Sequence, residues 1–580
     1  MTAQERYQLW CQHQDLLPEY RQQLEDMSND LTAIEDSFYQ ELQFGTAGLR
    51  GILGAGSNRM NYYTVTRAAE GFARFFLSQG EEYCKRGLAI SYDSRNMSAE
   101  FAHLTARIFV GHGINVFLAD ELRPVPMLSY AVRSKNCAGG VMITASHNPK
   151  EYNGFKAYGE DGGQLPPEAA KAVATEMDKL ADYLSLYQQV MPEAEAKKRP
   201  QWHELGEEFD QEFNAMLQEL VIDHAAIQEQ HDLKIIYTPL HGSGNKPVRR
   251  ILAAVGFTNV EVVPEQEKPD GNFPTAPYPN PEERAALNMA IELAEKRGAD
   301  LVIATDPDAD RTGVAVRNKR GEMVVLTGNQ IGLLLMDYIL SAKRQTGKLP
   351  AKSFCVTTIV SSKLTQVIAE HFGCDLTQTL TGFKYIGEQI KLRDEEGDEH
   401  FQFGFEESFG YLAGTKVRDK DAVVATMLIA EMAASAARKG ETLYDRLEQL
   451  FAKYGYAAEK TISVVLEGKA GQEKIAEALA YLRQHKQDAI GDLPITKIAD
   501  YQERLELDLA TGATKELTLP ESNVLLYYLE GLDWFCVRPS GTEPKLKIYM
   551  GFYARSKAEA EAKLAHAENM VSQAIQAQLN

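Results

Sequence analysis

Residues 139–156 read Gly-Gly-Val-Met-Ile-Thr-Ala-Ser-His-Asn-Pro-Lys-Glu-Tyr-Asn-Gly-Phe-Lys. The apolar run Val-Met-Ile predicts a buried strand, and it ends abruptly in a polar loop that holds Ser146 and His147. Ligands and chemistry collect at strand ends in α/β proteins, so the loop is a candidate site, with Lys156 ten residues beyond Ser146. An ordinary Ser/Asn/Pro turn has the same composition for backbone reasons alone, and other stretches have to decide between the two.

Length, composition and charge restrict the class of protein. The chain has 580 residues, more than one hydrophobic core usually supports, and we expect several domains. Hydrophobic residues make up 44% and charged residues 25%, which is typical of a globular protein. The formal net charge of −21 argues against nucleic acid as a partner, because phosphate backbones bind basic surfaces. A small anionic substrate stays possible if arginines and lysines gather locally.

Neither a membrane segment nor a disulfide framework is indicated. No apolar run approaches the length that spans a bilayer, and residues 1–14 lack the apolar centre of a signal peptide, so we expect a cytoplasmic protein without a membrane partner. The six cysteines are scattered, with no Cys-x-x-Cys pair. We therefore expect reduced, partly buried thiols and no zinc site.

Strand-like and helix-like segments alternate in three successive blocks, which predicts three similar α/β units with mixed, largely parallel sheets. In the first block a strand at 87–92 leads into the polar residues 93–95, and a helix at 98–112 has Ser98 as its expected N-cap. The segment 269–281 holds five prolines and is expected to be irregular.

The C-terminal part follows a different pattern. Apolar and polar residues alternate from Leu546 to Phe552, as in a half-buried strand, and Ser556-Lys-Ala-Glu559 predicts the capped start of a last helix. We expect a smaller α+β domain there, and four domains around a central cleft. The expected limits are a helical N-terminal extension at 1–40, α/β domains at 41–207, 208–325 and 326–452, and the α+β domain at 453–580.

Three aspartates alternate directly after a strand-like run, in Asp306-Pro-Asp-Ala-Asp-Arg311. Carboxylates this close repel each other unless a cation neutralises them, and oxygen ligands select hard ions. Asp306, Asp308 and Asp310 therefore predict a magnesium site. An EF-hand would have glycine where Arg311 stands and glutamate where Arg317 stands, and a solvated acidic turn is the plainer alternative.

Two further stretches suit phosphate and sugar. Arg538-Pro-Ser-Gly-Thr-Glu-Pro offers a guanidinium, two hydroxyls and backbone N–H groups for a phosphate, although a Pro/Gly turn explains the same residues. Glu406 and Ser408 supply an acceptor and a donor for sugar hydroxyls. There is no Walker loop and no Gly-x-Ser-x-Gly elbow. With the serine and the aspartates, these stretches suggest phosphoryl transfer on a phosphorylated polyol in a cleft between four domains.

Four motifs together closely resemble the four signatures of the α-D-phosphohexomutase superfamily. They are Thr-Ala-Ser146-His-Asn-Pro, Asp306-Pro-Asp-Ala-Asp-Arg311, Glu406-Glu-Ser-Phe-Gly and Arg538-Pro-Ser-Gly-Thr-Glu-Pro. The stretches Phe-Gly-Thr-Ala-Gly-Leu-Arg50-Gly, Asn153-Gly-Phe-Lys156 and Thr238-Pro-Leu-His-Gly match as well. The similarity runs in order from about residue 40 to the C-terminus, and within the superfamily the chain resembles the longer phosphoglucomutase branch.

The resemblance implies a four-domain, heart-shaped enzyme that interconverts glucose 1-phosphate and glucose 6-phosphate, with glucose 1,6-bisphosphate as intermediate and activator. Ser146 would carry a phosphoryl group and would hold magnesium together with the three aspartates. The molecule would be a monomer or a homodimer. The implied catalytic residues are Ser146, His147, Lys156, Arg50 and Arg311; the sugar-binding residues are Thr381, Gly382, Glu406, Ser408 and Lys420; the phosphate-binding residues are Arg538, Ser540, Gly541, Thr542 and Lys547.

Several alternatives stay open at this point. Phe405 stands where many members have glycine, which can alter the sugar loop, so phosphomannomutase, phosphopentomutase and glucose 1,6-bisphosphate synthase compete with phosphoglucomutase. An aspartyl-phosphate phosphatase, with Asp306 as nucleophile and Asp308 as acid/base, would want threonine where Asp310 stands. A non-catalytic sugar-phosphate sensor would not need the complete catalytic set.

Overall fold

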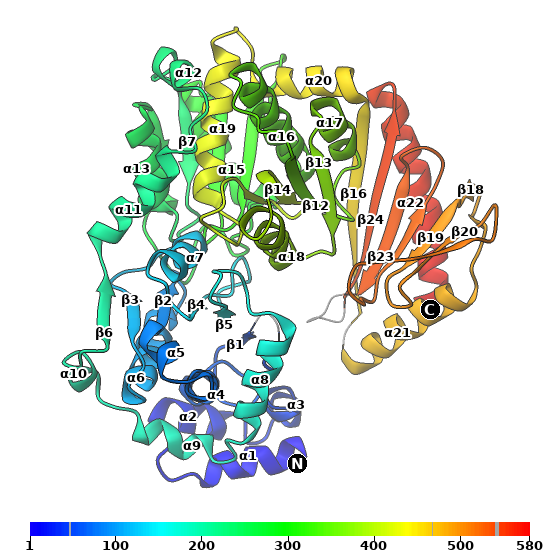
Figure 1. Cartoon of the computed structure of the whole chain (residues 1–580). Coiled ribbons are helices and arrows are strands. Elements are labelled where there is room, and N and C mark those ends of the chain that lie inside the picture. Colours follow the sequence, from blue (N-terminus) through cyan, green and yellow to red (C-terminus); the bar gives the residue numbers. More distant parts are fainter. Residues whose placement is uncertain (46–47, 467, 540–544, 580) are drawn as a thin grey trace.

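A computed structural model describes residues 1–45, 48–466, 468–539 and 545–579. It contains three α/β/α units with mixed sheets and a C-terminal unit with an antiparallel sheet, which follow one another along the chain (Figure 1). The strands of each large sheet all come from within one of the four domain ranges expected from the sequence. Among the described residues, no helix has both the length and the apolar character needed to cross a bilayer.

Three short helices precede the first sheet. They are α1 (Ala3–Gln12), α2 (Pro18–Asp26) and α3 (Leu31–Phe38). The side chains of Thr2 and Asp30 cap α1 and α3 by accepting hydrogen bonds from backbone N–H groups of the first turn. Trp10 and Phe38 are buried, and Trp10 contacts the ring of Tyr63 in α4 (Tyr62–Gln79) edge to face. The N-terminal helices are therefore packed onto the first α/β unit.

The carboxyl ends of the parallel strands in the first sheet lie at the same edge. Its order is β1-β5-β4-β2-β3-β6; β4, β2, β3 and β6 are parallel, and β5 and β1 are antiparallel to their neighbours. Every residue of β2 and β4 is buried, because helices pack against both strands, and this explains their continuous apolar runs. The elements are β1 (Leu49–Ile52), α5 (Glu81–Arg86), β2 (Leu88–Tyr92), α6 (Ser98–Gly111), β3 (Val116–Ala119), α7 (Val125–Ser134), β4 (Gly139–Ile143), β5 (Tyr152–Tyr158), α8 (Pro167–Asp178), α9 (Tyr183–Leu186), η1 (Tyr187–Gln189), α10 (Glu193–Ala196) and β6 (Trp202–Leu205).

The second and third sheets are also mixed. Their orders are β11-β10-β9-β7-β8 and β13-β12-β14-β15, with parallel pairs at one side and antiparallel pairs at the other. The second unit comprises α11 (Glu207–Gln218), α12 (His224–Glu229), β7 (Ile235–Thr238), α13 (Asn245–Val255), β8 (Val260–Val262), α14 (Pro264–Glu267), α15 (Arg284–Arg297), β9 (Leu301–Thr305), β10 (Thr312–Arg317) and β11 (Met323–Val325). The third comprises α16 (Gly328–Gln345), β12 (Ser353–Thr358), α17 (Leu364–Phe372), β13 (Asp375–Thr379), α18 (Phe383–Ile390), the π-helical turn η2 (Lys391–Glu395), β14 (His400–Glu406), β15 (Gly410–Leu412), α19 (Ala422–Ala437) and α20 (Leu443–Tyr454).

The C-terminal unit is built on a seven-stranded sheet of order β16-β24-β23-β22-β19-β20-β21, antiparallel throughout. As expected for the last helix, the Ser556 hydroxyl accepts from the N–H of Glu559 at 3.3 Å. The elements are β16 (Tyr456–Val465), α21 (Gly468–Gln484), β17 (Ala489–Ile490), β18 (Leu493–Pro494), β19 (Lys497–Asp500), β20 (Leu505–Asp508), β21 (Thr514–Glu516), β22 (Leu525–Tyr528), β23 (Trp534–Pro539), β24 (Lys545–Ala554) and α22 (Lys557–Leu579).

One local prediction is wrong, and one strand beside the candidate site was not predicted. Ser98 is not the N-cap of α6: Met97, with a φ of 69°, holds that position, and the Ser98 hydroxyl donates instead to Asp93 at 2.7 Å. The strand β5, which carries Lys156, was not predicted, because its Asn-Gly pair resembles a turn. That glycine, Gly154, lies between two strands, and a Cβ there would be 2.6 Å from the carbonyl oxygen of Thr144.

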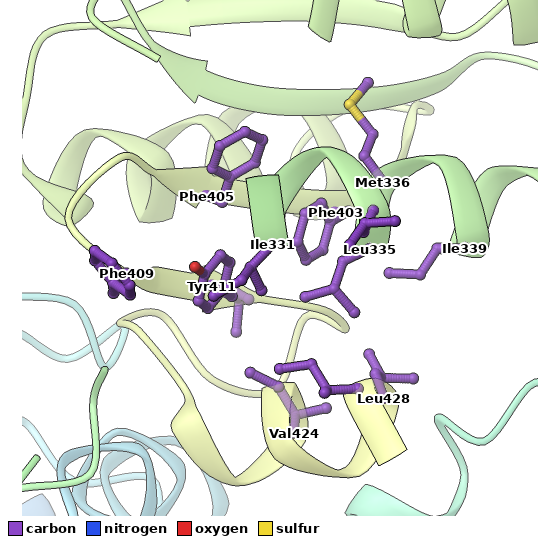
Figure 2. Packing of buried hydrophobic residues seen from close by; sticks show 14 of the residues in the cluster. Ile331, Leu335, Met336, Ile339, Phe403, Phe405, Phe409, Tyr411, Val424 and Leu428 are labelled. Atoms are coloured by element: carbon purple, nitrogen blue, oxygen red, sulfur yellow. The ribbon is translucent and has the colours of Figure 1, made fainter. Parts of the chain in front are cut away.

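Phe405 belongs to the hydrophobic core of the third unit and does not enter the sugar loop. Its ring is wholly buried and lies with Phe403, Tyr411 and residues of α16 and α19 (Figure 2). A Cβ added at Gly332 of α16 would be 2.4 Å from the Phe405 ring. Gly332 in the facing helix therefore provides the space for the Phe405 ring. Glu406, the residue after Phe405, is the last residue of β14.

Candidate active site

Ser146 lies just beyond the end of β4, in the loop Thr144 to Pro149, called the serine loop below. It is 3% exposed and has a φ of +54°, in the left-handed region that non-glycine residues rarely adopt. Its Oγ donates to Oδ2 of Asp306 at 2.9 Å and is 3.2 Å from Nδ1 of His147. The hydroxyl is thus oriented by a carboxylate from a second unit, 160 residues away in sequence.

The three aspartates follow β9 and form a compact, buried group. Asp306, Asp308 and Asp310 are each at most 1% exposed, and one oxygen from each carboxylate lies within 4.8 Å of the others. Oδ1 of Asp306 accepts the backbone N–H groups of Asp310 and Arg311. Oδ1 of Asp308 and Oδ1 of Asp310 are buried without a hydrogen-bond partner among the described residues. Buried carboxylate oxygens without donors fit the ligand set of a hard cation such as magnesium.

Burial and neighbouring charges shift the pKa values of Asp306 and Asp308 in different directions. Burial, reinforced by the neighbouring carboxylates, raises the pKa of Asp306 well above its ordinary value. Burial acts in the same direction on Asp308, but its neighbours, Lys156 first and Lys420 as well, together outweigh it and hold the pKa of Asp308 below its ordinary value. Nearby cationic side chains therefore offset part of the negative charge of this group.

Two lysines neutralise the aspartates from the other units. Nζ of Lys156 donates to Asp308 at 2.8 Å and is 3.5 Å from Oδ2 of Asp310. Nζ of Lys420 lies 3.1 Å from Oδ2 of Asp310 and 3.3 Å from Oδ1 of Asp419. Although burial lowers the pKa of both ammonium groups, the carboxylates outweigh it and raise both. Residues from three units therefore meet at one cluster of charge.

His147 and two arginines surround the serine. Burial, with Arg311 and Arg50 nearby, lowers the pKa of His147 well below its ordinary value, so its imidazole is neutral near pH 7. Arg50 donates from β1 to Oδ1 of Asn148 in the serine loop at 3.2 Å. Arg311 pairs with the carboxylate of Glu282. The structure thus places the other four expected catalytic residues near Ser146 or the aspartates that contact it.

The expected sugar-binding residues lie at strand and helix ends of the third unit. Glu406 is buried at the end of β14, and Ser408 is half-buried in the turn to β15. Gly382 has a φ of 118° and, with Thr381 before it, leads into α18. Glu406 is close enough to raise the pKa of both Arg311 and Lys420. Glu406, one of the expected sugar-binding residues, therefore lies near the charged side chains around the aspartates.

Two of the expected phosphate-binding residues can be placed. Arg538 of β23 lies directly opposite Lys547 of β24, so both side chains share one face of the antiparallel sheet. Burial lowers the pKa of Lys547, and Glu282 and Glu407 of the other units lie close enough to oppose that shift. The expected residues Ser540, Gly541 and Thr542 lie outside the described residues.

Asp93 and Arg95 were not predicted as site residues, although both contact the serine loop. The carboxylate of Asp93 accepts from the Thr144 hydroxyl at 2.6 Å, and Arg95 donates to the carbonyl of Ser146 at 2.6 Å. They follow β2, the parallel neighbour of β4. Because parallel neighbours end at the same edge of a sheet, strand order would have indicated them, and strand order is not readable from one sequence.

The comparisons with known proteins agree with this arrangement. The family described as phosphoglucomutase/phosphomannomutase, alpha/beta/alpha domain I, matches residues 41–184, its domain II matches 211–321 and its domain III matches 327–454. The chain belongs to this family, and the enzyme is a phosphohexomutase of the isomerase class.

Its curated relatives include phosphoglucomutases of Staphylococcus. That of Staphylococcus epidermidis is 38% identical over 530 residues, 91% of this chain and 94% of the relative. That of Staphylococcus aureus is 35% identical over 552 residues, 95% of this chain and 96% of the relative.

Two solved structures share the fold. The crystal structure of a putative phosphomannomutase from Thermus thermophilus has a TM-score of 0.65 and 22% identity, and the match covers 92% of this chain and 99% of that one. The open form of a Paramecium phosphoglucomutase has a TM-score of 0.64 and 17% identity, with 93% and 96% covered.

Proposed function

We propose that this chain catalyses the interconversion of glucose 1-phosphate and glucose 6-phosphate. Phosphorylated Ser146 transfers its phosphoryl group to the free hydroxyl of the monophosphate, and glucose 1,6-bisphosphate forms. The bisphosphate turns end for end, and its other phosphate returns to the Ser146 hydroxyl, which restores the phosphoenzyme. The relatives named phosphoglucomutase support glucose over mannose or pentose as the sugar.

Two side chains can carry the proton that moves in each half-reaction. Nδ1 of His147 is 3.2 Å from Oγ of Ser146, within reach of its proton when the serine attacks. Its lowered pKa keeps the imidazole free to accept that proton. Lys156, the other candidate, is held as an ammonium by the carboxylates that raise its pKa, and we assign it to donate a proton to the sugar oxygen when the phosphoryl group leaves that oxygen.

Charge on the transferring group is met by cations. Magnesium fits the three aspartates, because the buried Oδ1 atoms of Asp308 and Asp310 have no donor in the described part of the chain; held there with Ser146, it would offset the negative charge of the phosphoryl group. Arg50 and Arg311 supply guanidinium groups to the phosphoryl oxygens. These contacts act by position and charge, which is how phosphoryl transfer is chiefly accelerated.

The rest of the substrate is held by the third and fourth units. The sugar hydroxyls bind to Thr381, Gly382, Glu406, Ser408 and Lys420. Arg538 and Lys547, with Ser540, Gly541 and Thr542, hold the phosphate that is not reacting. Because the bisphosphate turns, this pocket receives the 6-phosphate in one half-reaction and the 1-phosphate in the other.

One observation carries the proposal: the Ser146 hydroxyl donates to Asp306 at 2.9 Å, beside two carboxylates that each keep a buried oxygen without a donor among the described residues. The same geometry disfavours Asp306 as a nucleophile in a phosphatase. Both of its oxygens accept hydrogen bonds, one from two backbone N–H groups and the other from Ser146. The serine is the nucleophile that the site orients.

The test is the intact mass and turnover of three proteins: wild type, Ser146→Ala, and, as control, Ser28→Ala in the turn between α2 and α3. We expect one phosphoryl group on part of the wild type and of the control, resistant to acid and hydroxylamine, and none on Ser146→Ala. A hydroxylamine-labile group would favour the aspartate. Coupled assays with glucose, mannose, glucosamine and ribose monophosphates, with and without bisphosphate, decide the sugar.

The sequence also predicts properties on which the reaction does not depend. A cytoplasmic location, the lack of a nucleic-acid partner, a monomeric or homodimeric state and the domain limits remain predictions. Size-exclusion chromatography with light scattering measures the oligomeric state directly.

A further inference from the structure

Arg95 holds the serine loop from beneath. Its side chain is wholly buried, and the guanidinium donates to the carbonyl oxygens of Ser146 at 2.6 Å, Pro149 at 2.9 Å and Tyr152 at 3.1 Å, and to that of Asn148. The five N–H donors of a guanidinium are spread over three nitrogens in a rigid plane, so it can reach carbonyls that lie farther apart than the single nitrogen of a lysine can reach. The left-handed backbone of Ser146 is therefore held by a side chain whose donors are directed at backbone carbonyls.

The face of this guanidinium is covered by the second unit. The ring of Phe273 lies 4.9 Å from Cζ of Arg95, a cation–π contact, and Phe273 is 1% exposed. Phe273 has a φ of +45°, an unusual backbone for an aromatic residue. It belongs to the irregular segment with five prolines, to which the catalytic proposal assigns no role.

The backbone of this segment also lies against the first unit. A Cβ at Gly271 would be 2.4 Å from the backbone nitrogen of Asn96, and Nδ2 of Asn96 donates to Oδ1 of Asn272 at 3.2 Å. On its other side, His241 lies 2.8 Å from the hydroxyl of Thr275. The segment is thus anchored to the second unit and in close contact with the residue next to Arg95.

Further along, the same segment reaches the aspartate loop. Glu282, directly after the last proline, pairs with Arg311, the residue that follows Asp310. One stretch of about a dozen residues therefore contacts the support of the serine loop at one end and the arginine of the aspartate loop at the other. Its position depends on both loops being in place.

We propose that Phe273 is a positioning residue for the phosphoryl transfer: by covering Arg95 it holds the serine loop, and with it Ser146, in register with the aspartates. The expected effect on turnover rests on the proposed function. The expected effect on the serine loop does not depend on that function. Loss of the ring leaves the buried guanidinium without a partner on its face, and the carbonyl contacts loosen.

The experiment compares Phe273→Leu with Phe257→Leu, a buried core position of the second unit, in the full-length enzyme. We expect hydrogen exchange of the amides at 145–152 to accelerate in Phe273→Leu and not in Phe257→Leu. kcat should fall by about two- to thirtyfold, the loss of one cation–π contact, with KM within about twofold. Phe273→Met serves as a second variant if the leucine variant does not accumulate as folded protein.

A double-mutant cycle separates positioning from general stability. In an Arg95→Lys background, Phe273→Leu should add little to the exchange rate or to the loss of kcat, whereas Phe257→Leu should add its effect independently. The proposal would be overturned if the amides at 145–152 exchanged as slowly in Phe273→Leu as in the wild type. Full additivity of the effects of Phe273→Leu and Arg95→Lys on exchange and kcat would overturn it as well. A wild type that lacks glucose phosphate turnover but shows this coupling would refute the proposed function and leave the positioning role intact.

Discussion

Ser146 shows how a strained residue is held at the candidate catalytic position. A left-handed backbone costs a non-glycine residue roughly 1–2 kcal/mol, so it persists only where neighbours over-determine it. Here its N–H donates to the Thr144 hydroxyl at 2.8 Å and its carbonyl accepts from Arg95. In this conformation the Oγ donates to Asp306 of the second unit, a long-range contact that the composition of an ordinary turn does not require.

The aspartates give a prediction at the same scale. Chelation followed by dialysis should abolish turnover, and magnesium should restore it, because Asp308 and Asp310 each keep a buried oxygen without a donor among the described residues. Magnesium should also raise the melting temperature of the wild type, since an ion that binds only the folded state stabilises it. Asp308→Asn should weaken this rise. Full activity in excess chelator after exhaustive dialysis would contradict the prediction.

At the scale of elements, α19 begins at a buried cap. Asp421 accepts the N–H groups of Val423 and Val424, each at 2.9 Å, and is 1% exposed. Burial raises its pKa from an ordinary 3.8 to about 7. Because the folded-state pKa is raised, this carboxyl favours the folded state most at low pH, and the contribution is lost as pH rises through about 7.

Asp421→Asn should therefore flatten the pH dependence of stability. The amide keeps an acceptor for the cap but cannot ionise, so the variant should gain roughly 1–4 kcal/mol over the wild type at about pH 8 and much less at about pH 4. Urea unfolding of both proteins at the two pH values measures the difference. An equal change at both would show that the carboxyl does not titrate between them.

The contact between α16 and β14 gives the second prediction for elements. Gly332→Ala should destabilise the enzyme by about 1–3 kcal/mol, because the added Cβ would be 2.4 Å from the Phe405 ring. Gly111→Ala in α6 is the matched control: a Cβ there meets nothing within 4 Å, so it should stabilise slightly. Thermal unfolding checks both, and Phe405→Leu should rescue Gly332→Ala.

At the scale of the whole molecule, the candidate active site forms only where the units meet. Lys156 of the first unit and Lys420 of the third both pair with aspartates of the second. An isolated bridge between Arg311 and Gly410 joins the second and third units. Arg538 and Lys547 bring the fourth unit to the same cluster of charge, since Arg311 affects the pKa of Lys547. A single unit taken alone would keep its own loop of candidate site residues, but the complete site would not form.

Arg538→Ala tests whether the fourth unit binds the same substrate that reacts at Ser146. If the bisphosphate turns, the variant should weaken both directions of the mutase while phosphoserine and metal binding persist. A lost charge-assisted bond is worth roughly 1.5–3 kcal/mol, so kcat/KM should fall by about ten- to a hundredfold. More bisphosphate should escape into solution. A defect in one direction alone, or in neither, would show that Arg538 is not a shared phosphate contact.

The repeated strand–helix pattern and the residues at strand ends could be predicted from the order of amino acids alone. Ser146 and the three aspartates were predicted because apolar runs stop abruptly before them, and this local pattern reflects burial of the strand itself. The motifs also indicated the family. The N-cap at Ser98 was wrong, because its hydroxyl donates to Asp93, a tertiary neighbour that local propensity does not report.

Which strand ends meet depends on the tertiary fold. The fold placed Arg95 under the serine loop, put β5 with Lys156 beside β4, and turned the Phe405 ring into the core rather than the site. Such contacts join residues far apart in the chain, as Ser146 and Asp306 are, 160 positions from each other. Periodicity reports how deeply a segment is buried but not against which partner, and the partner depends on strand order and on how the units pack.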